Sequence, residues 1–211
     1  MKDEDKLVST YYRKDGTKLS EGNKKDGKQD GLWTYYHANG QVHGQGRFIN
    51  GDGGNPSESS GIPFNGRRGS WTFWHENGQK SSEGTNNDGK QDGGLTQWYE
   101  NGQKSSEGTY KDGEPNGLWT FWHENGQKSS EGTNNDGKED GLWTSWYESG
   151  KKEWKWAYKD GKKVGLCNKW YESGKKQKEG NYKDGEPNGL WTKWYESGKK
   201  KWKGTYKDGK E

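Results

Sequence analysis

The chain has 211 residues, with 35 basic and 32 acidic side chains and a formal net charge of +3. Only 22% of it is apolar, and 14 Trp, 12 Tyr and 4 Phe outnumber 8 Leu, 3 Val, 2 Ile and 2 Ala. This composition excludes a conventional aliphatic core, and no apolar run approaches the ~20 residues of a membrane-spanning helix. The many aromatic residues and the small net charge also argue against disorder.

The first seven residues, Met1–Leu7, are mostly charged and lie outside the pattern that follows. They contain no apolar stretch of the kind that directs secretion. Cys167 is the only cysteine, so no disulfide can form within the chain. These observations favour a cytoplasmic protein.

A unit of 24 residues repeats along the rest of the chain. The peptide at 77–85, for example, returns at 101–109 and again at 125–133. The units align on Thr10, Thr34, Thr72, Thr96, Thr120, Thr144, Asn168 and Thr192. One interval is 14 residues longer than the others, and the extra length lies within an insertion loop at 52–67. We therefore expect an N-terminal extension at 1–7 and a repeat array at 8–211.

Each unit has the pattern of a β-hairpin. A first strand such as Leu118–His123 is rich in residues that suit a pleated sheet and ends at Asn125-Gly126. Asn-Gly is the strongest signal for a two-residue type I′ turn. A second strand such as Lys104–Tyr110 then reaches an Asp-Gly or Asn-Gly turn, and these closing turns run from Asp26-Gly27 through Asn50-Gly51 to Asp208-Gly209. The sequence predicts an all-β fold, an elongated single-layer antiparallel β-meander of about eight 24-residue hairpin repeats.

Side-chain alternation divides each strand between two faces of the sheet. In the unit at 118–123, Trp119 points to one face with the other odd-numbered residues, and Leu118 and Trp122 point to the other. Successive copies of a strand lie two strands apart, about 9.6 Å, so large rings are needed to fill the space between them. We therefore expect aromatic residues, rather than aliphatic ones, to stabilise the sheet.

The motifs Gly117–Thr120, Tyr147–Lys152 and Glu179–Gly185 resemble the MORN repeat, in the variant found in bacterial proteins labelled YwqK-family antitoxins. The insertion peptide Gly61–Gly66 resembles an inter-repeat loop of such proteins, and the resemblance covers nearly the whole chain. It implies a MORN-like scaffold that binds proteins or, in some cases, lipid headgroups, and an antitoxin-like role is one special case. The resemblance implies no catalytic motif.

Two units depart from this pattern, because Leu95 and Cys167 replace the tryptophan of the first strand. Gaps in the aromatic packing are expected there. Cys167 is interpreted as a small buried residue rather than a reactive thiol.

Signals for catalysis or metal binding are absent from the sequence. It has no Ser-His-Asp arrangement, P-loop or dinucleotide fingerprint, so we expect neither an enzyme nor a cofactor. His37, His75 and His123 occupy a position where other units have tyrosine, which indicates aromatic substitution rather than a metal site. The Asp-Gly turns lack the ligand set of a calcium loop.

Three surfaces are candidates for binding. The first is the exposed part of an aromatic face that contains Trp71, Trp119, Trp143, Trp191, His75, His123, Tyr147 and Tyr195. A regular aromatic surface could contact a strand or helix of a protein partner, or stack on the sugar rings of a glycan. The alternative is that these rings pack only on each other.

The second candidate is a stripe of lysines that follow the hairpin turns, Lys151, Lys152, Lys175, Lys176, Lys199 and Lys200. Residues 150–211 hold 18 Lys against 9 Asp and Glu, a net charge of +9, whereas residues 1–149 have a net charge of −6. Such a stripe could bind phosphates or an anionic lipid surface. The alternative is that the lysines protect a final edge strand, at 202–206, from aggregation.

The third candidate is the insertion loop with the pair Arg67-Arg68, because insertions in repeat proteins often lie on the binding face. A tolerated surface loop is the alternative. We therefore predict a non-enzymatic scaffold that binds a protein partner through its aromatic face or insertion. Attachment to an anionic membrane or polyanion is the alternative function, glycan binding is a third, and exposed end strands would allow homo-oligomers.

Overall fold

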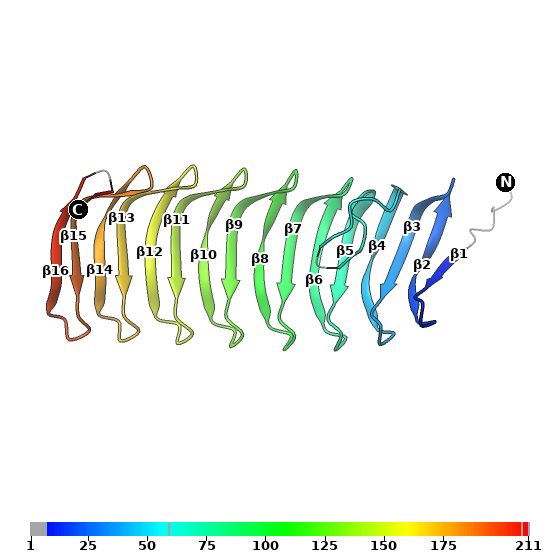
Figure 1. Ribbon diagram of the computed structural model, residues 1–211, viewed down its shortest axis with the longest axis horizontal. Coiled ribbons are helices and arrows are strands. Elements are labelled where there is room, and N and C mark those ends of the chain that lie inside the picture. The colour runs from blue at the N-terminus through cyan, green and yellow to red at the C-terminus, as the bar shows by residue number, and fades with distance from the viewer. Residues whose placement is uncertain (1–7, 59, 208, 211) are drawn as a thin grey trace. The chain divides into compact units, whose positions relative to one another are not determined.

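The computed structural model describes residues 8–58, 60–207 and 209–210, so the predicted extension at 1–7 lies outside the described residues. The described residues form sixteen β-strands and no helix. The strands are β1 (Val8–Tyr12), β2 (Lys18–Lys25), β3 (Lys28–Tyr36), β4 (Val42–Gly51), β5 (Arg67–Trp74), β6 (Lys80–Asn87), β7 (Lys90–Trp98), β8 (Lys104–Lys111), β9 (Glu114–Trp122), β10 (Lys128–Asn135), β11 (Lys138–Trp146), β12 (Lys152–Lys159), β13 (Lys162–Trp170), β14 (Lys176–Lys183), β15 (Glu186–Trp194) and β16 (Lys200–Tyr206). They follow one another in chain order in one antiparallel sheet, which confirms the predicted fold class (Figure 1).

The chain divides into two compact units, which we describe separately. The first extends to Lys104 and includes Tyr110–Glu114, and the second comprises Ser105–Thr109 and the residues from Pro115 onward. Strands β1–β7 pair in sequence within the first unit, and β9–β16 do so within the second.

The two kinds of turn differ in backbone conformation. At the Asp-Gly turns both residues have positive φ, as at Asp136 (45°) and Gly137 (78°), and Asn135 pairs directly with Lys138. These are two-residue type I′ turns, at positions where the sequence predicted turns. The equivalent aspartates with positive φ are Asp26, Asp88, Asp112, Asp160 and Asp184, whereas Asp208 lies outside the described residues.

The prediction of type I′ turns at Asn-Gly was wrong. Only Gly126 has positive φ, at 82°, and Asn125 does not. Gly126 N donates to His123 O over 2.9 Å, and His123 N donates to Gln127 O over 2.8 Å, so the loop has three residues. This is a type I turn followed by a left-handed glycine. The turn forms because Asn125 Oδ1 accepts the Gln127 N–H at 2.9 Å, which holds the asparagine in the type I conformation.

The Asn50-Gly51 turn was also predicted incorrectly. Strand β4 continues to Gly51, and the insertion then occupies residues 52–66 before β5 begins at Arg67. Asn50 has positive φ inside the strand, where Ile49 N donates to Gly66 O over 2.8 Å. The insertion therefore takes the place of the expected turn.

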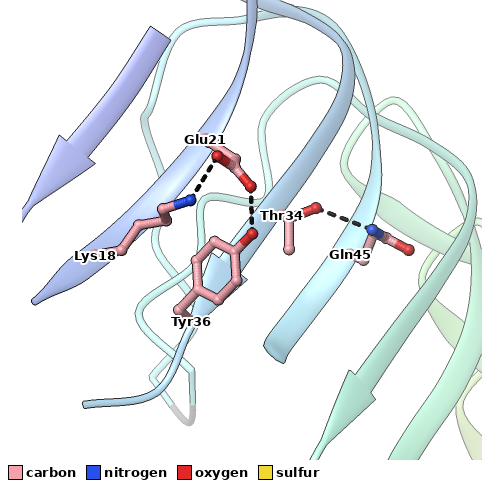
Figure 2. A network of polar contacts seen from close by, with 5 residues as sticks. All are labelled: Lys18, Glu21, Thr34, Tyr36 and Gln45. Atoms are coloured by element: carbon pink, nitrogen blue, oxygen red, sulfur yellow. Dashed lines mark hydrogen bonds and ion pairs between the residues drawn. The ribbon is translucent and has the colours of Figure 1, made fainter. Parts of the chain in front are cut away.

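The two faces of the sheet have different chemistry. One, here called the indole face, carries Trp33 and its equivalents. The other, here called the polar face, carries ion pairs and hydrogen bonds. In the first unit Lys18 Nζ lies 2.9 Å from Glu21 Oε2, and Tyr36 Oη donates to the same carboxylate (Figure 2). Gln45 Nε2 donates to Thr34 Oγ1 over 2.9 Å on this face (Figure 2).

Candidate binding surfaces

In five of the repeats the basic packing contact is a tryptophan that lies over a glycine of the preceding strand. A Cβ added to Gly132 on β10 would lie 2.0 Å from Trp143 Cδ2 on β11, so only glycine leaves room for this ring. The indole Nε1–H also donates to Thr133 O over 3.1 Å. The same contact joins Trp33 to Gly22, Trp71 to Gly46, Trp119 to Gly108 and Trp191 to Gly180.

This contact buries the tryptophans that the sequence suggested as binding residues. Trp71 is 0% exposed, Trp119 5%, Trp143 7% and Trp191 1%. The expectation of an exposed indole surface is therefore corrected, because glycine lets each ring lie flat against its neighbouring strand. The rings pack on one another as the alternative foresaw: Phe121 lies between Trp119, at 5.9 Å, and Trp143, at 6.5 Å. These indoles form the core and offer no free face to a sugar ring.

The histidines and tyrosines that follow the first strand hold neighbouring hairpins together. His75 Nε2 donates to Trp98 O over 2.9 Å, and His123 Nε2 donates to Trp146 O over 2.9 Å. Tyr147 Oη donates to Trp170 O over 2.7 Å in the same way. Histidine and tyrosine therefore perform the same structural task, which explains why one replaces the other. Tyr195 differs, since it is 51% exposed and Lys201 Nζ lies 5.3 Å from its ring centroid.

The insertion packs on the indole face of the first unit. Ile62 is 1% exposed and joins one cluster of buried residues with Trp33, Tyr35, Phe48 and Trp71. The loop is therefore a structural cover for strands β3–β5.

Arg67 is part of this core, and its assignment as a binding residue is corrected. It is 3% exposed, and its guanidinium donates to Pro63 O and Ile62 O, each over 2.7 Å. The guanidinium carbon also lies 4.1 Å from the Phe64 ring centroid. Burial lowers the pKa of Arg67 to about 10. Arg68 is exposed and donates to Asn87 Oδ1 over 2.6 Å, so it remains available on the surface.

The six candidate lysines lie where the sequence placed them, at the hairpin turns of the second unit. The carbonyl groups of Lys151, Lys175 and Lys199 close these turns by accepting the N–H of a tyrosine. Lys152, Lys176 and Lys200 begin strands β12, β14 and β16. Lys176 forms an ion pair with Glu179, as equivalent lysines do in other units, whereas the other five are exposed.

A row of leucines on the polar face was not identified from the sequence. Its four members lie on alternate strands of the second unit, and each is more than half exposed: Leu118 56%, Leu142 52%, Leu166 53% and Leu190 51%. Their register partners on the strands between them include Thr133 and Ala157. The signal in the sequence is the leucine that precedes the tryptophan position in four successive 24-residue repeats.

Beside this leucine row, lysine replaces glutamate in two of the 24-residue repeats. Lys155 on β12 pairs with Thr144, and the equivalent position in the preceding repeat is Glu131, which pairs with Thr120. Lys203 on β16 pairs with Thr192. The leucine row therefore has basic neighbours. Within the described residues, no group of three or more His, Cys, Asp or Glu side chains could hold a metal ion. The same residues contain no helix that is long and apolar enough to cross a membrane.

The single sheet of repeated hairpins in the described residues defines this molecule as a β-repeat protein. The family described as MORN repeat variant matches the chain at residues 29–50, 67–85, 91–112, 115–133, 139–160, 163–184 and 187–208. These matches cover more than half of the chain, and the protein belongs to this family. A search of the curated proteins finds no match.

Proposed function

We propose that the protein is a non-enzymatic scaffold that binds a protein partner through the leucine row. The observation that carries this proposal is the exposure of four leucines, each above 50%, at one repeated position. Copies of a strand that are two strands apart lie about 9.6 Å from each other, so the leucines form a regular apolar row. Regular apolar surface of this kind is typical of interaction sites.

The chemistry around the leucine row favours a partner with both apolar and acidic side chains. Burying a half-exposed leucine completely contributes about 1 kcal/mol, so four of them supply several kcal/mol. Lys155 and Lys203 lie on the same face and would attract carboxylates of the partner. A toxin held by an antitoxin-like protein would be one example of such a partner.

The proposal is tested by capture of partners on the full chain, followed by chemical crosslinking and mass spectrometry. Leu142→Ser combined with Leu166→Ser should abolish a specific capture. Ile49→Ser is the matched control, since Ile49 is 48% exposed but lies in the first unit. Equal capture by the wild-type chain and the double variant would show that the leucine row is not the contact surface.

A second candidate function is attachment to an anionic membrane or polyanion through the lysine-rich C-terminal repeats. The net charge of +9 in residues 150–211 supports it. Each lysine near an anionic lipid surface contributes about 1 kcal/mol, and salt screens this attraction within about 10 Å at 0.1 M. Replacing Lys151, Lys175, Lys199 and Lys200 by Gln should therefore remove binding to anionic vesicles. Binding that is unchanged by these substitutions and by salt would exclude this function.

A further inference from the structure

Three lysines lie side by side across adjacent strands on the indole face of the second unit. Lys178 on β14 is the register partner of Lys169 on β13 and of Lys193 on β15. Side chains that are directly opposite each other on neighbouring strands have Cβ atoms about 5 Å apart. Like charges in this arrangement repel and destabilise a sheet. Three positive charges therefore occupy neighbouring positions on this face.

The equivalent positions elsewhere in the chain are uncharged. They hold Ser20, Tyr35, Gly44, Phe73, Ser82, Gln97, Phe121, Ser130 and Ser145. The strands on either side of the three lysines carry indoles at the paired positions, since Trp154 on β12 pairs with Lys169 and Trp202 on β16 pairs with Lys193. The lysine cluster is therefore a local departure from the repeat and is not required by the fold.

The ammonium groups lie against aromatic rings. Lys169 Nζ lies 4.6 Å from the Trp154 ring centroid, Lys193 Nζ lies 4.8 Å from that of Trp202, and Lys178 Nζ lies 4.4 Å from that of Trp191. The two outer lysines thus lie over rings of the outer strands and away from Lys178. Cation–π contacts of this kind offset part of the repulsion but neutralise none of the charge.

Few carboxylates compensate this charge. Glu153 Oε1 lies 3.5 Å from Lys169 Nζ, and both side chains are partly exposed. Among the residues that the structure describes, neither Lys178 nor Lys193 has a carboxylate within ion-pair distance. Burial, followed by the charge of Lys193, lowers the pKa of Lys178. An anion bound at this position would stabilise the charged form of Lys178.

A surface cavity of about 270 Å³ lies at the lysine cluster. Four lysines line it, since Lys201 joins the other three, and its lining contains no acidic residue. Gln177 also lines the cavity, and its Oε1 is buried with no hydrogen-bond partner among the described residues. The cavity therefore combines positive charge, which suits an anion, with a buried acceptor oxygen to which a hydroxyl group of the same ligand could donate.

We propose that Lys169, Lys178 and Lys193 form a binding site for a phosphomonoester dianion. Such a group carries about −1.5 to −2 charges at pH 7 and has three acceptor oxygens, which match three ammonium donors. Charge-assisted hydrogen bonds from lysine to phosphate are about twice as strong as neutral ones. The indoles of Trp154 and Trp202 supply apolar walls for the organic part of the ligand.

This site is independent of the proposed protein-binding surface. Leu166 and Lys169 are three residues apart on one strand, so their side chains lie on opposite faces of the sheet. Variants of the leucine row should therefore leave anion binding unchanged, and variants of the lysine cluster should leave partner capture unchanged.

The test is calorimetric titration of the full chain with glucose 6-phosphate and with inorganic phosphate, with glucose as the uncharged control. Lys178→Gln should weaken binding about tenfold, as expected for the loss of one charge-assisted contact. Lys183→Gln removes the same charge at the exposed end of β14 and should change the affinity less than about twofold. Circular dichroism verifies that both variants keep their strands.

Vesicles distinguish a soluble ligand from a lipid headgroup. Phosphatidylcholine vesicles with and without phosphatidic acid provide the lipid probe, and Lys178→Gln is compared on both. Binding that depends on Lys178 supports the site, whether the soluble ester or phosphatidic acid carries the phosphate. Equal losses for Lys178→Gln and Lys183→Gln would show diffuse electrostatic attraction and overturn the proposal, as would the absence of saturable binding to all three phosphate probes.

Discussion

Trp156 on β12 and Cys167 on β13 exchange the roles that glycine and tryptophan have in the other units. The 24-residue period places Trp156 in the position of Gly132 and Gly180, and Cys167 in the position of Trp143 and Trp191. Cys167 is 3% exposed, as predicted for a small buried residue, and burial raises the pKa of its thiol. The indole thus enters from the opposite strand of the pair. We therefore expect the half-buried Trp156 to fill the gap beside Cys167.

This exchange predicts a strong coupling between the two positions. Trp156→Gly alone should destabilise the second unit by about 3 kcal/mol, because it leaves a cavity beside Cys167. Cys167→Trp alone should destabilise it through overpacking against Trp156. The double variant restores the arrangement of the other units and should unfold within about 1 kcal/mol of the wild type. Urea denaturation followed by circular dichroism measures all four proteins, and additive effects would contradict the exchange.

The glycine below each indole predicts a second pair of variants. In Gly132→Ala the new Cβ would lie 2.0 Å from Trp143 Cδ2, so the ring must move, and a loss of about 2–4 kcal/mol is expected. Gly94→Ala is the matched control, because a Cβ there has no atom within 4 Å and its φ is not positive. The control should be neutral or slightly stabilising. Equal thermal midpoints for the two variants would refute the role of Gly132.

Arg67 predicts how the insertion is held on the first unit. Arg67→Lys keeps the positive charge but cannot reproduce two directed hydrogen bonds to Ile62 O and Pro63 O. A loss of about 2 kcal/mol is expected, together with faster proteolysis within 52–66. Arg68→Lys is the control, since Arg68 is exposed. Limited proteolysis and thermal unfolding provide the measurements, and unchanged cleavage in Arg67→Lys would contradict this role.

His43 predicts a loss of stability in mild acid. Its ring lies 4.2 Å from that of His37, and burial, followed by the charges of His37 and Arg13, lowers the pKa of His43 to about 4. Glu76 acts in the opposite direction. Because the unfolded chain binds this proton at a higher pH than the folded chain does, the His43 contribution is complete above about pH 6.5 and decreases as the pH falls towards 4.

The size of this effect is bounded by the partial exposure of the ring. A full shift would correspond to about 3 kcal/mol, and solvent screening reduces this value. His43→Gln cannot titrate, so its stability should fall less than that of the wild type between pH 7 and pH 5. Thermal midpoints measured across this range test the difference. Parallel curves for the two proteins would show that His43 is not responsible.

The sequence by itself determined the architecture, because the local signals agree with one another. A fixed 24-residue period, alternating side chains and a Gly-containing turn at each strand end allow one topology, an antiparallel meander. The positions of the Asp-Gly turns could be predicted from the sequence, and both residues of each described Asp-Gly turn have positive φ. The turn at Asn125-Gly126 could not, because a side-chain hydrogen bond to Gln127 selects a three-residue loop.

The tertiary structure decided which aromatic residues are exposed and which are core. The alternation of side chains places Trp143 on one face of the sheet. It does not show that the Trp143 ring covers Gly132 of the preceding strand, which leaves the ring only 7% exposed. The alternation also did not indicate that Leu142 on the other face would be 52% exposed. The burial of Arg67 depends on the path of the insertion, which covers this side chain and accepts its hydrogen bonds. Burial arises from contacts between strands, and a pattern along one strand does not contain them.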